Sequence, residues 1–430
     1  MKIYLDTIGC RLNQSEIETM ARQFRAAGHE IVASAEQAEM AVVNTCAVTN
    51  EAASDSRGRI RQIARAGVNE IVATGCWTTL YPKQAGELPN VLHVVPNASK
   101  DNLVAETLHL QPSSISLHPF DSEPISRQPL PGLHRRTRAF IKVQDGCDNQ
   151  CTFCITTVAR GDGRSRPVAD VILDIQSALA GGTKEIVLTG VHLGSWGYDF
   201  DSHITELIKA ILRETDTPRL RLSSLEPWDL TNEFFSLWKD RRLMPHLHLP
   251  LQSGSESTLK RMARKTTPQS FRELVAAARK AIPDVSITTD IIAGFPGETE
   301  KEFAETLAFV EEMRFAGGHV FTYSSRPGTG AARMKGQVKT ELGKKRNHIL
   351  HDVLEESAKS YRQKFVGRTM PVLWESTSEM GEWGWQMEGW TGNYLRVQAF
   401  APSPRWNEMD NVVLEEATTH GMKGVIANLG

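Results

Sequence analysis

The 430-residue chain has few cysteines, almost no net charge and no long apolar segment. Six cysteines are too few for a disulfide scaffold at this length, so they are expected to be thiols available to metals or catalysis. No uncharged apolar run approaches the ~18 residues that cross a bilayer, and the opening segment MKIYLDTIGC contains an acid, so we expect a cytoplasmic protein with no membrane partner. With a net charge of −2, any nucleic-acid partner has to be bound by local basic patches.

What the chain does contain is a pattern of α/β type that predicts three domains. Residues 1–110 alternate short β-type runs with helical patterns, which is typical of a Rossmann-like parallel sheet. Residues 111–134 are rich in proline and predict a linker. Residues 135–365 predict an open (β/α)6 barrel, and residues 366–430, with alternating polarity, aromatic residues and glycine turns, predict a small all-β barrel.

The expected elements follow the apolar periodicity. The strands of the first domain are KIYLDTIG, EIVAS, MAVVNT, EIVATG and VLHVV, and those of the barrel are AFIKVQ, EIVLTGV, RLRLSSLE, HLHLPL, SITTDIIAGF and GHVFTYS. Expected helices cover about 52–66, 168–180, 203–215, 255–264, 267–281, 299–314 and 339–365. Asn13, with Glu16 after it, is expected to cap the first helix, which Gly28 would end. Thr299 with Glu302 predicts another capping box.

Three cysteines lie close together in DGCDNQCTFC, directly after the first expected barrel strand: Cys147, Cys151 and Cys154. A structural zinc site normally has four ligands. A ferredoxin-type run has a fourth cysteine followed by proline, but the next residues here are ITTV. The spacing therefore favours a [4Fe-4S] cluster with one iron open to a substrate or cofactor, over a zinc site or cysteines that only pack.

The other cysteines, Cys10, Cys46 and Cys76, each follow a predicted strand, in TIGC, VNTC and ATGC. The carboxyl ends of parallel strands share one edge of a sheet, where open α/β sheets bind ligands. We therefore expect these three thiols to converge on a shared metal site. Buried cysteines that pack as small apolar groups are the alternative.

The motif CxxxCxxC after the first strand of a barrel resembles the radical S-adenosylmethionine (SAM) superfamily. Within it the chain resembles the methylthiotransferase family along its whole length. The motifs that carry this resemblance are GCRLNQSEIE, VVNTCAVTN, VATGCW, KVQDGCDNQCTFCITTVARGDGRSR, LTGVHLGSWG, RLSSLEP, LHLPLQSGS and DIIAGFPGET. The resemblance implies two [4Fe-4S] clusters, a radical-generating one on Cys147, Cys151 and Cys154 and a sulfur-carrying one on Cys10, Cys46 and Cys76. It also implies a C-terminal RNA-binding TRAM domain.

GCRLNQSE, VLTGVHLG and RLSSLEP most resemble the MtaB branch of this family, which converts N6-threonylcarbamoyladenosine next to the tRNA anticodon to its 2-methylthio derivative. The hydrogen at adenine C2 is poorly acidic, so a general base has little to work on, whereas a radical can remove it. The resemblance implies that one SAM methylates the sulfur and another supplies the radical. The partners expected for this protein are tRNA and a flavodoxin- or ferredoxin-like electron donor. Isopentenyladenosine or a ribosomal-protein aspartate as substrate, or an RNA-binding protein with structural metals, remain alternatives.

Glycine and polar residues at the expected strand ends are candidates for binding SAM, since glycine allows close approach of the backbone and polar groups can bind hydroxyls. They are Gly190, Ser223, Ser224, Glu226, Gln252 and Asp290. Each is equally explained as a turn or capping residue. His192 and His248 are expected to be structural histidines rather than ligands.

Basic and aromatic residues are candidates for binding phosphates and bases of RNA, with surface charge or core packing as the alternative. These are Arg57, Arg59, Arg61 and Arg65; Arg135, Arg136 and Arg138; and Trp383, Trp385 and Trp390, of which one is expected to face RNA. Three further arginines follow the cysteine loop and are candidates for binding a carboxylate or phosphate, with unpaired surface charge as the alternative: Arg160, Arg164 and Arg166.

Overall fold

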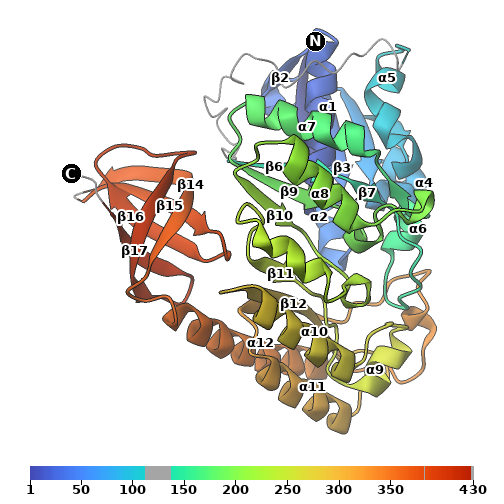
Figure 1. Ribbon diagram of the computed structural model, residues 1–430. Helices are drawn as coiled ribbons and strands as arrows, with labels where there is room; N and C mark the ends of the chain where they lie inside the picture. Colours follow the sequence, from blue (N-terminus) through green and yellow to red (C-terminus); the bar gives the residue numbers. More distant parts are fainter. Residues whose placement is uncertain (112–136, 382, 428–430) are drawn as a thin grey trace.

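The computed structural model describes residues 1–111, 137–381 and 383–427 (Figure 1). Figure 1 shows the N-terminal sheet in blue, a central barrel in green to yellow, and a C-terminal β-barrel in orange to red, which lies to one side and is joined through the long helix α12. The expected fold class is confirmed, including the closed barrel expected for a TRAM domain. The expected linker, beyond residue 111, and Arg135 and Arg136 lie outside the described residues.

The N-terminal domain is a parallel sheet in the order β2-β1-β3-β4-β5. Its strands are β1 (Lys2–Thr7), β2 (Glu30–Val32), β3 (Met40–Thr45), β4 (Glu70–Gly75) and β5 (Val91–Val95). Its helices are α1 (Arg11–Ala26), α2 (Asn50–Arg65), α3 (Cys76–Leu80), α4 (Pro82–Gly86) and α5 (Leu103–Thr107). Every residue of β3 is buried, which is typical of a parallel strand covered on both faces.

The expected start of the first helix was wrong. Helix α1 begins at Arg11, with Cys10 at its N-cap, so Asn13 and Glu16 lie inside the helix and are buried. The Asn13 amide donates to the backbone carbonyls of Ile8 and Thr45, and Glu16 accepts hydrogen bonds from other parts of the chain. These two residues match a capping box in sequence, but in the structure they make tertiary contacts instead.

The central barrel consists of two parallel three-stranded sheets, β6-β9-β10 and β11-β12-β13, which meet at a bridge between Ser224 and His248. Its strands are β6 (Arg138–Lys142), β9 (Glu185–Thr189), β10 (Arg219–Leu222), β11 (His246–His248), β12 (Ser286–Ala293) and β13 (Gly317–Thr322), with a small hairpin-like pair β7 (Gln144–Asp145) and β8 (Arg164–Ser165). No ladder joins β6 to β13 among the described residues, so the barrel is open.

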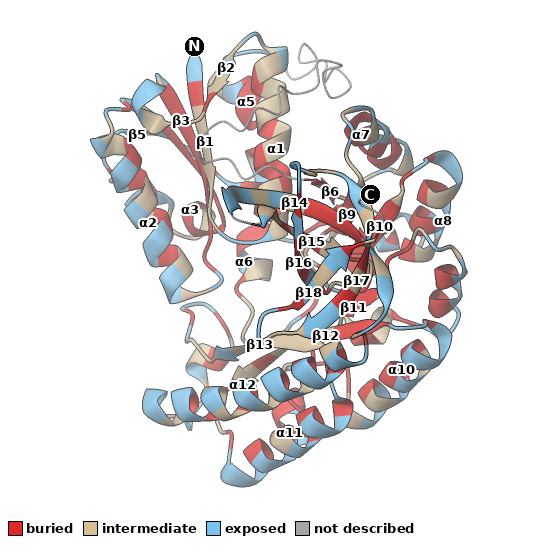
Figure 2. Cartoon of the chain, turned by 90° about the vertical axis from the view of Figure 1, so that its left-hand side faces the viewer, coloured by how far each residue is buried: buried red, intermediate tan, exposed pale blue. Residues whose placement is uncertain are grey.

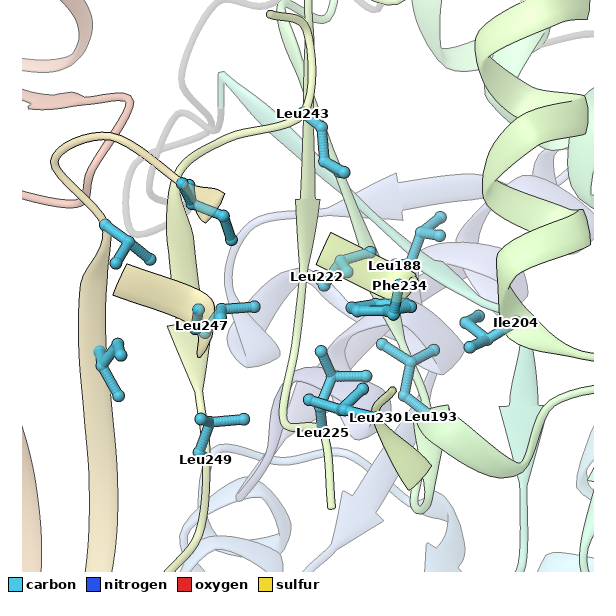
Figure 3. Packing of buried hydrophobic residues seen from close by; sticks show 14 of the residues in the cluster. Leu188, Leu193, Ile204, Leu222, Leu225, Leu230, Phe234, Leu243, Leu247 and Leu249 are labelled. Atoms are coloured by element: carbon cyan, nitrogen blue, oxygen red, sulfur yellow. The ribbon is translucent and has the colours of Figure 1, made fainter. Parts of the chain in front are cut away.

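Helices cover the outside of this barrel. They are α6 (Thr156–Arg160), α7 (Val168–Ala180), α8 (Ile204–Glu214), α9 (Glu256–Arg261), α10 (Pro268–Ala281), α11 (Glu300–Met313) and α12 (Thr340–Gln363). The expected capping box of α11 is confirmed, because the Thr299 hydroxyl accepts from the Glu302 amide at 3.2 Å and the Glu302 carboxylate accepts from the Thr299 amide at 2.8 Å. Figure 3 shows how Leu188, Leu222 and Phe234 pack together in the core between strands and helices.

The C-terminal barrel closes in the order β14-β15-β16-β18-β17. Its strands are β14 (Thr369–Gly381), β15 (Gly384–Thr391), β16 (Arg396–Ala401), β17 (Met409–Ala417) and β18 (Met422–Ile426). Figure 2 shows buried residues along these strands and those of the central barrel, and exposed residues along the outer faces of α10, α11 and α12. Within the described ranges, no helix is long and apolar enough to cross a membrane.

The turn between β15 and β16 packs against the strand N-termini of the central barrel, opposite the edge where the cysteine loop lies. Arg219 donates to the Thr391 carbonyl at 2.9 Å and Arg221 to the Gly392 carbonyl at 3.0 Å. Both guanidinium groups bind the buried carboxylate of Glu185, at 2.7 and 2.8 Å. Burial alone would raise the pKa of Glu185, but Arg221 and Arg219 lower it to about 2. The ion pairs with Glu185 hold both arginines in place, and the hydrogen bonds of these arginines to Thr391 and Gly392 attach the C-terminal barrel away from the cysteine loop.

We predict that Glu185→Gln destabilises the protein by ~3–5 kcal/mol, because it leaves two buried guanidinium groups without their counter-charge. Urea unfolding followed by circular dichroism measures the change, and Glu256→Gln, in an exposed ion pair with Lys260, is the control expected to cost less than ~0.5 kcal/mol. A carboxylate whose pKa is lowered by folding stabilises above its unfolded pKa of about 4.3 and loses that contribution as pH falls. The difference in the free energy of unfolding between the wild type and Glu185→Gln should therefore decrease as the pH falls from 5 towards about 2. A difference that does not change with pH would contradict the lowered pKa of Glu185.

Candidate functional site

The loop that carries Cys147, Cys151 and Cys154 is held tightly by its backbone. Gly146 has φ +69°, and a Cβ placed there would lie 1.8 Å from the Asp162 carbonyl oxygen, so only glycine fits. The Cys147 amide donates to the Gly161 carbonyl at 3.0 Å and the Cys154 amide to the Cys151 carbonyl at 3.0 Å. The positions of the three thiols are therefore set by the backbone.

Hydrogen-bond donors point at the sulfur atoms of this loop. The backbone and side-chain amides of Asn149 lie 3.5 Å from Cys147 Sγ, and the Thr156 amide lies 3.4 Å from Cys154 Sγ. The Arg264 guanidinium lies 3.8 Å from Cys151 Sγ. Donors of this kind stabilise thiolates and tune the reduction potential of iron–sulfur clusters.

His192, expected to be structural, is hydrogen-bonded as that expectation requires. Its Nε2 lies 2.5 Å from Asp229 and its Nδ1 lies 3.1 Å from the Asn149 amide. Burial would lower the pKa of His192, but the hydrogen bonds to Asp229 and Cys147 raise it to about 9. His192 thus lies beside the cysteine loop, which the sequence did not indicate.

The second trio lies at the carboxyl edge of the N-terminal sheet, where Cys10, Cys46 and Cys76 follow β1, β3 and β4. Cys46 and Cys76 are buried and Cys10 is exposed. Gly9 lies directly against Cys46, since a Cβ on Gly9 would be 2.7 Å from Cys46 Sγ. The Asn97 amide lies 3.7 Å from Cys76 Sγ and also donates to the Ala159 carbonyl at 2.7 Å, in the helix that follows the other cysteine loop.

A single metal ion and an iron–sulfur cluster need different arrangements of three thiols. Among the described residues, no group of three or more Cys, His, Asp or Glu side chains is positioned to hold one metal ion. In a [4Fe-4S] cluster each thiolate binds a different iron, so the sulfurs need not converge on one point. Burial raises the pKa of Cys46 and of Cys151 to about 11, so metal binding has to displace their protons.

The SAM candidates lie beyond the carboxyl ends of β9 to β11, except Asp290, which was expected at a strand end but lies inside β12. Three of them carry features that suit ligand binding: the Ser223 hydroxyl and Asp290 Oδ1 are buried without a hydrogen-bond partner, and Gln252 has φ +69°, which is strained for a non-glycine residue. Ser224 is exposed, and Gly190 lies against the Gln144 side chain.

The other candidate, Glu226, binds Arg264, which the sequence analysis missed. The guanidinium donates to the Glu226 carboxylate at 2.6 and 3.1 Å and stacks over Trp228 at 4.4 Å. Both terminal nitrogens of Arg264 are engaged by Glu226 and the Pro250 carbonyl, so this buried arginine acts on the site through the Cys151 sulfur. No sequence signal distinguished Arg264 from other arginines, because its partners come from other strands.

His248 is hydrogen-bonded to Thr288 at 2.9 Å and lies 3.1 Å from the Asp290 carboxylate, as expected for a structural histidine.

Several arginines considered for RNA are engaged within the protein. Arg138 forms an ion pair with Glu375, and Arg166 pairs with Asp174 at 2.8 Å. Arg160 is buried and binds carboxylates, so it cannot contact phosphate.

The remaining RNA candidates lie partly or fully at the surface. Arg164 is half exposed, and Arg59, on α2, pairs with Asp6 at 2.5 Å and is 42% exposed. Trp383 is 75% exposed, whereas Trp385 and Trp390 are partly buried. Trp390 donates to Glu375 at 2.8 Å, so Trp383 is the tryptophan of the three that is free to stack on a base.

Comparisons with known proteins agree with this site. The Radical SAM superfamily matches residues 141–310, and the uncharacterized protein family UPF0004 matches residues 2–96. The radical SAM methyltransferase TsrM from Kitasatospora setae, solved with cobalamin and a [4Fe-4S] cluster, has a TM-score of 0.57 over 77% of both chains at 15% identity. The cobalamin-dependent radical enzyme OxsB has a TM-score of 0.51 over 82% of this chain and 56% of that one, at 12% identity. At these identities the likeness shows the fold alone.

Closer relatives are found by sequence. The threonylcarbamoyladenosine tRNA methylthiotransferase MtaB of Thermotoga maritima is 38% identical over 87% of this chain and 86% of that protein. MtaB of Bacillus subtilis is 36% identical over 91% of this chain and 88% of that protein. The tRNA-2-methylthio-N(6)-dimethylallyladenosine synthase of Bacillus velezensis is 30% identical over 99% and 86%. The chain therefore belongs to the radical SAM methylthiotransferase family.

Proposed function

We propose that this protein is a tRNA methylthiotransferase that converts N6-threonylcarbamoyladenosine next to the anticodon to its 2-methylthio derivative. The observation that carries the proposal is the presence of two cysteine trios, neither with a fourth cysteine, on adjoining elements. Helix α3, which begins at Cys76, packs against α6, which begins two residues after Cys154. An enzyme that generates a radical and delivers sulfur to the same carbon needs two such centres close together.

Membership in the radical SAM superfamily implies SAM and a [4Fe-4S] cluster. When bound, they supply a carbon radical strong enough to remove the C2 hydrogen of adenine. Cys147, Cys151 and Cys154 would hold this cluster, with donors from Asn149 and Thr156 on its sulfurs.

The side chains around this centre can bind the rest of SAM. The unpaired Ser223 hydroxyl and Asp290 carboxylate oxygen would bind hydroxyl groups, and Arg264, held by Glu226, would donate toward the Cys151 sulfur.

For the second centre we propose a [4Fe-4S] cluster on Cys10, Cys46 and Cys76 that carries the sulfur to be transferred. Cys10 lies at the N-cap of α1, and burial raises the pKa of its thiol, which lies 3.8 Å from the Asn13 amide oxygen. Asn97 links this trio to α6 through Cys76 Sγ and the Ala159 carbonyl. We further expect a flavodoxin- or ferredoxin-like protein to deliver the electrons.

The choice of substrate is supported by the MtaB relatives, which are more similar to this chain than the dimethylallyladenosine synthase. For the tRNA, we propose contacts from exposed Trp383 on the C-terminal barrel and from the arginines of α2. A tryptophan can stack on any base, and arginines contact phosphates without regard to sequence.

Nucleoside mass spectrometry of tRNA tests the substrate. Deleting the gene should remove 2-methylthio-N6-threonylcarbamoyladenosine, and expression of the wild-type chain, but not of Cys46→Ala, should restore it. Loss of the 2-methylthio isopentenyl derivative instead would reassign the substrate, and unchanged tRNA would point to a protein target.

Iron counts separate the two centres. The anaerobically reconstituted chain should bind about eight irons, and Cys147→Ala and Cys46→Ala about four each. With dithionite, Cys46→Ala should still cleave SAM to 5′-deoxyadenosine, because its radical centre is intact, whereas Cys147→Ala should not. Zinc in place of iron, with inert SAM, would instead support an RNA-binding protein with structural metals.

Gly146→Ala should lose the iron of the radical centre, about four atoms per chain, since its Cβ cannot fit beside the Asp162 carbonyl. Iron analysis and SAM cleavage measure the loss. Gly58→Ala, in α2 with open space around the added Cβ, is the matched control and should bind as much iron as the wild type. Full iron content in Gly146→Ala would refute this account of the loop.

A further inference from the structure

A cluster of buried polar and charged side chains lies between the N-terminal domain and the central barrel. We call it the interdomain charge cluster; its members, all at most 8% exposed, are Asn13, Glu16, Asn44, Lys100, Asp145 and Arg160. Glu16 accepts from Lys100 Nζ at 2.8 Å and from Asn44 at 3.1 Å. Lys100 also donates to the Asn44 amide oxygen at 3.2 Å.

Arg160 is the member that joins the two domains. From α6 of the barrel it donates to Glu16 at 2.8 Å and to the Asn13 amide oxygen at 2.7 Å, both on α1 of the N-terminal domain. The same guanidinium donates to Asp145 of the barrel at 2.9 Å. Its planar fork thus bonds to both domains at once, with fixed directions.

The partners of Arg160 lie next to the cysteines in sequence. Asn13 is in the first turn after Cys10, and the Cys10 thiol lies 3.8 Å from the Asn13 amide oxygen that accepts from Arg160. Asp145 precedes Cys147 by two residues, and its carboxylate also accepts from the Gly146 amide at 2.8 Å.

Asn44 connects a third cysteine segment to the cluster. It precedes Cys46 by two residues and donates to the Asn13 carbonyl at 3.0 Å. The interdomain charge cluster therefore connects segments from both cysteine trios within two or three residues of the thiols.

Apolar contacts alone would hold the two domains together without fixing their distance, because such contacts have no direction. Buried ion pairs contribute little net stability, but they penalise any arrangement that leaves a charge unpaired. Buried ion pairs are therefore suited to fixing the relative position of two domains.

We propose that Arg160 is a positioning residue that sets the distance between the two cysteine trios, and so between the radical-generating and the sulfur-carrying centre. The inference rests on the proposed function, since it requires a cluster on each trio. Reacting atoms displaced by ~1 Å can cost ~100-fold in rate. A shift between the trios should therefore uncouple radical formation from sulfur transfer.

The test uses the full chain with both centres loaded. Arg160→Lys keeps the buried positive charge but replaces the planar fork, whose two terminal nitrogens bind Glu16, Asp145 and Asn13 in fixed directions, by a single nitrogen on a shorter side chain. We expect iron content and 5′-deoxyadenosine formation near those of the wild type, methylthiolated tRNA lower by ~100-fold, and a changed magnetic interaction between the two reduced clusters in electron paramagnetic resonance. Arg213→Lys, on the outer helix α8 and 70% exposed, is the control expected to match the wild type in all four measurements.

An Arg160→Lys protein with wild-type cluster–cluster interaction and wild-type product yield per 5′-deoxyadenosine overturns the inference. Should this variant fail to fold, Asp145→Asn replaces it, because it leaves Arg160 bound to Glu16 and Asn13 and weakens the contacts of Asp145 on the barrel side, including the one to Arg160. The Asp145→Asn protein is expected to show the same change in the magnetic interaction between the two reduced clusters. An interaction equal to that of the wild type would again overturn the inference. A wild-type chain with a single cluster refutes the proposed function itself, which is a different result.

Discussion

The structure depends on the high free-energy cost of a buried charge without a partner. Buried carboxylates accordingly meet arginine or lysine from other segments. Glu16 of the N-terminal domain meets Lys100 and, across the domain boundary, Arg160; within the central barrel domain Glu185 meets Arg219 and Arg221, and Glu298 meets Arg346 of α12. Because the Glu16–Arg160 pair spans two domains, it favours one arrangement of the N-terminal domain on the central barrel.

This arrangement leaves the carboxyl edge of the barrel for chemistry. The turn between β15 and β16 occupies the strand N-termini, where Tyr394 stacks on His246 and accepts hydrogen bonds from Arg11 and Arg138. The cysteine loop and the SAM candidates lie at the opposite ends of the strands. The C-terminal barrel is thus attached to the catalytic barrel without covering its active edge.

The sequence predicted the strands and both cysteine trios because these follow local patterns, namely apolar periodicity and residues that come directly after a strand. The prediction that Asn13 and Glu16 cap the first helix was wrong, because a capping box and a buried interdomain contact can be formed by the same residue types at the same spacing. Arg160 and Arg264 could not be assigned, because their partners Glu16 and Glu226 are 144 and 38 residues away in sequence. Such partners become visible only when the domains are packed.

A local sequence feature, a glycine directly before the cysteine, is shared by three of the six cysteines. Cys10, Cys76 and Cys147 each follow a glycine with positive φ, at +112°, +100° and +69°. In each case a Cβ on the glycine would lie within 2.7 Å of a neighbouring atom, so no other residue fits without a shift. The glycine turns the chain sharply where a strand ends and directs the next thiol to the edge of the sheet. A Gly-Cys pair after a strand therefore indicates a cysteine whose position is set by the backbone, which cysteine spacing alone does not show.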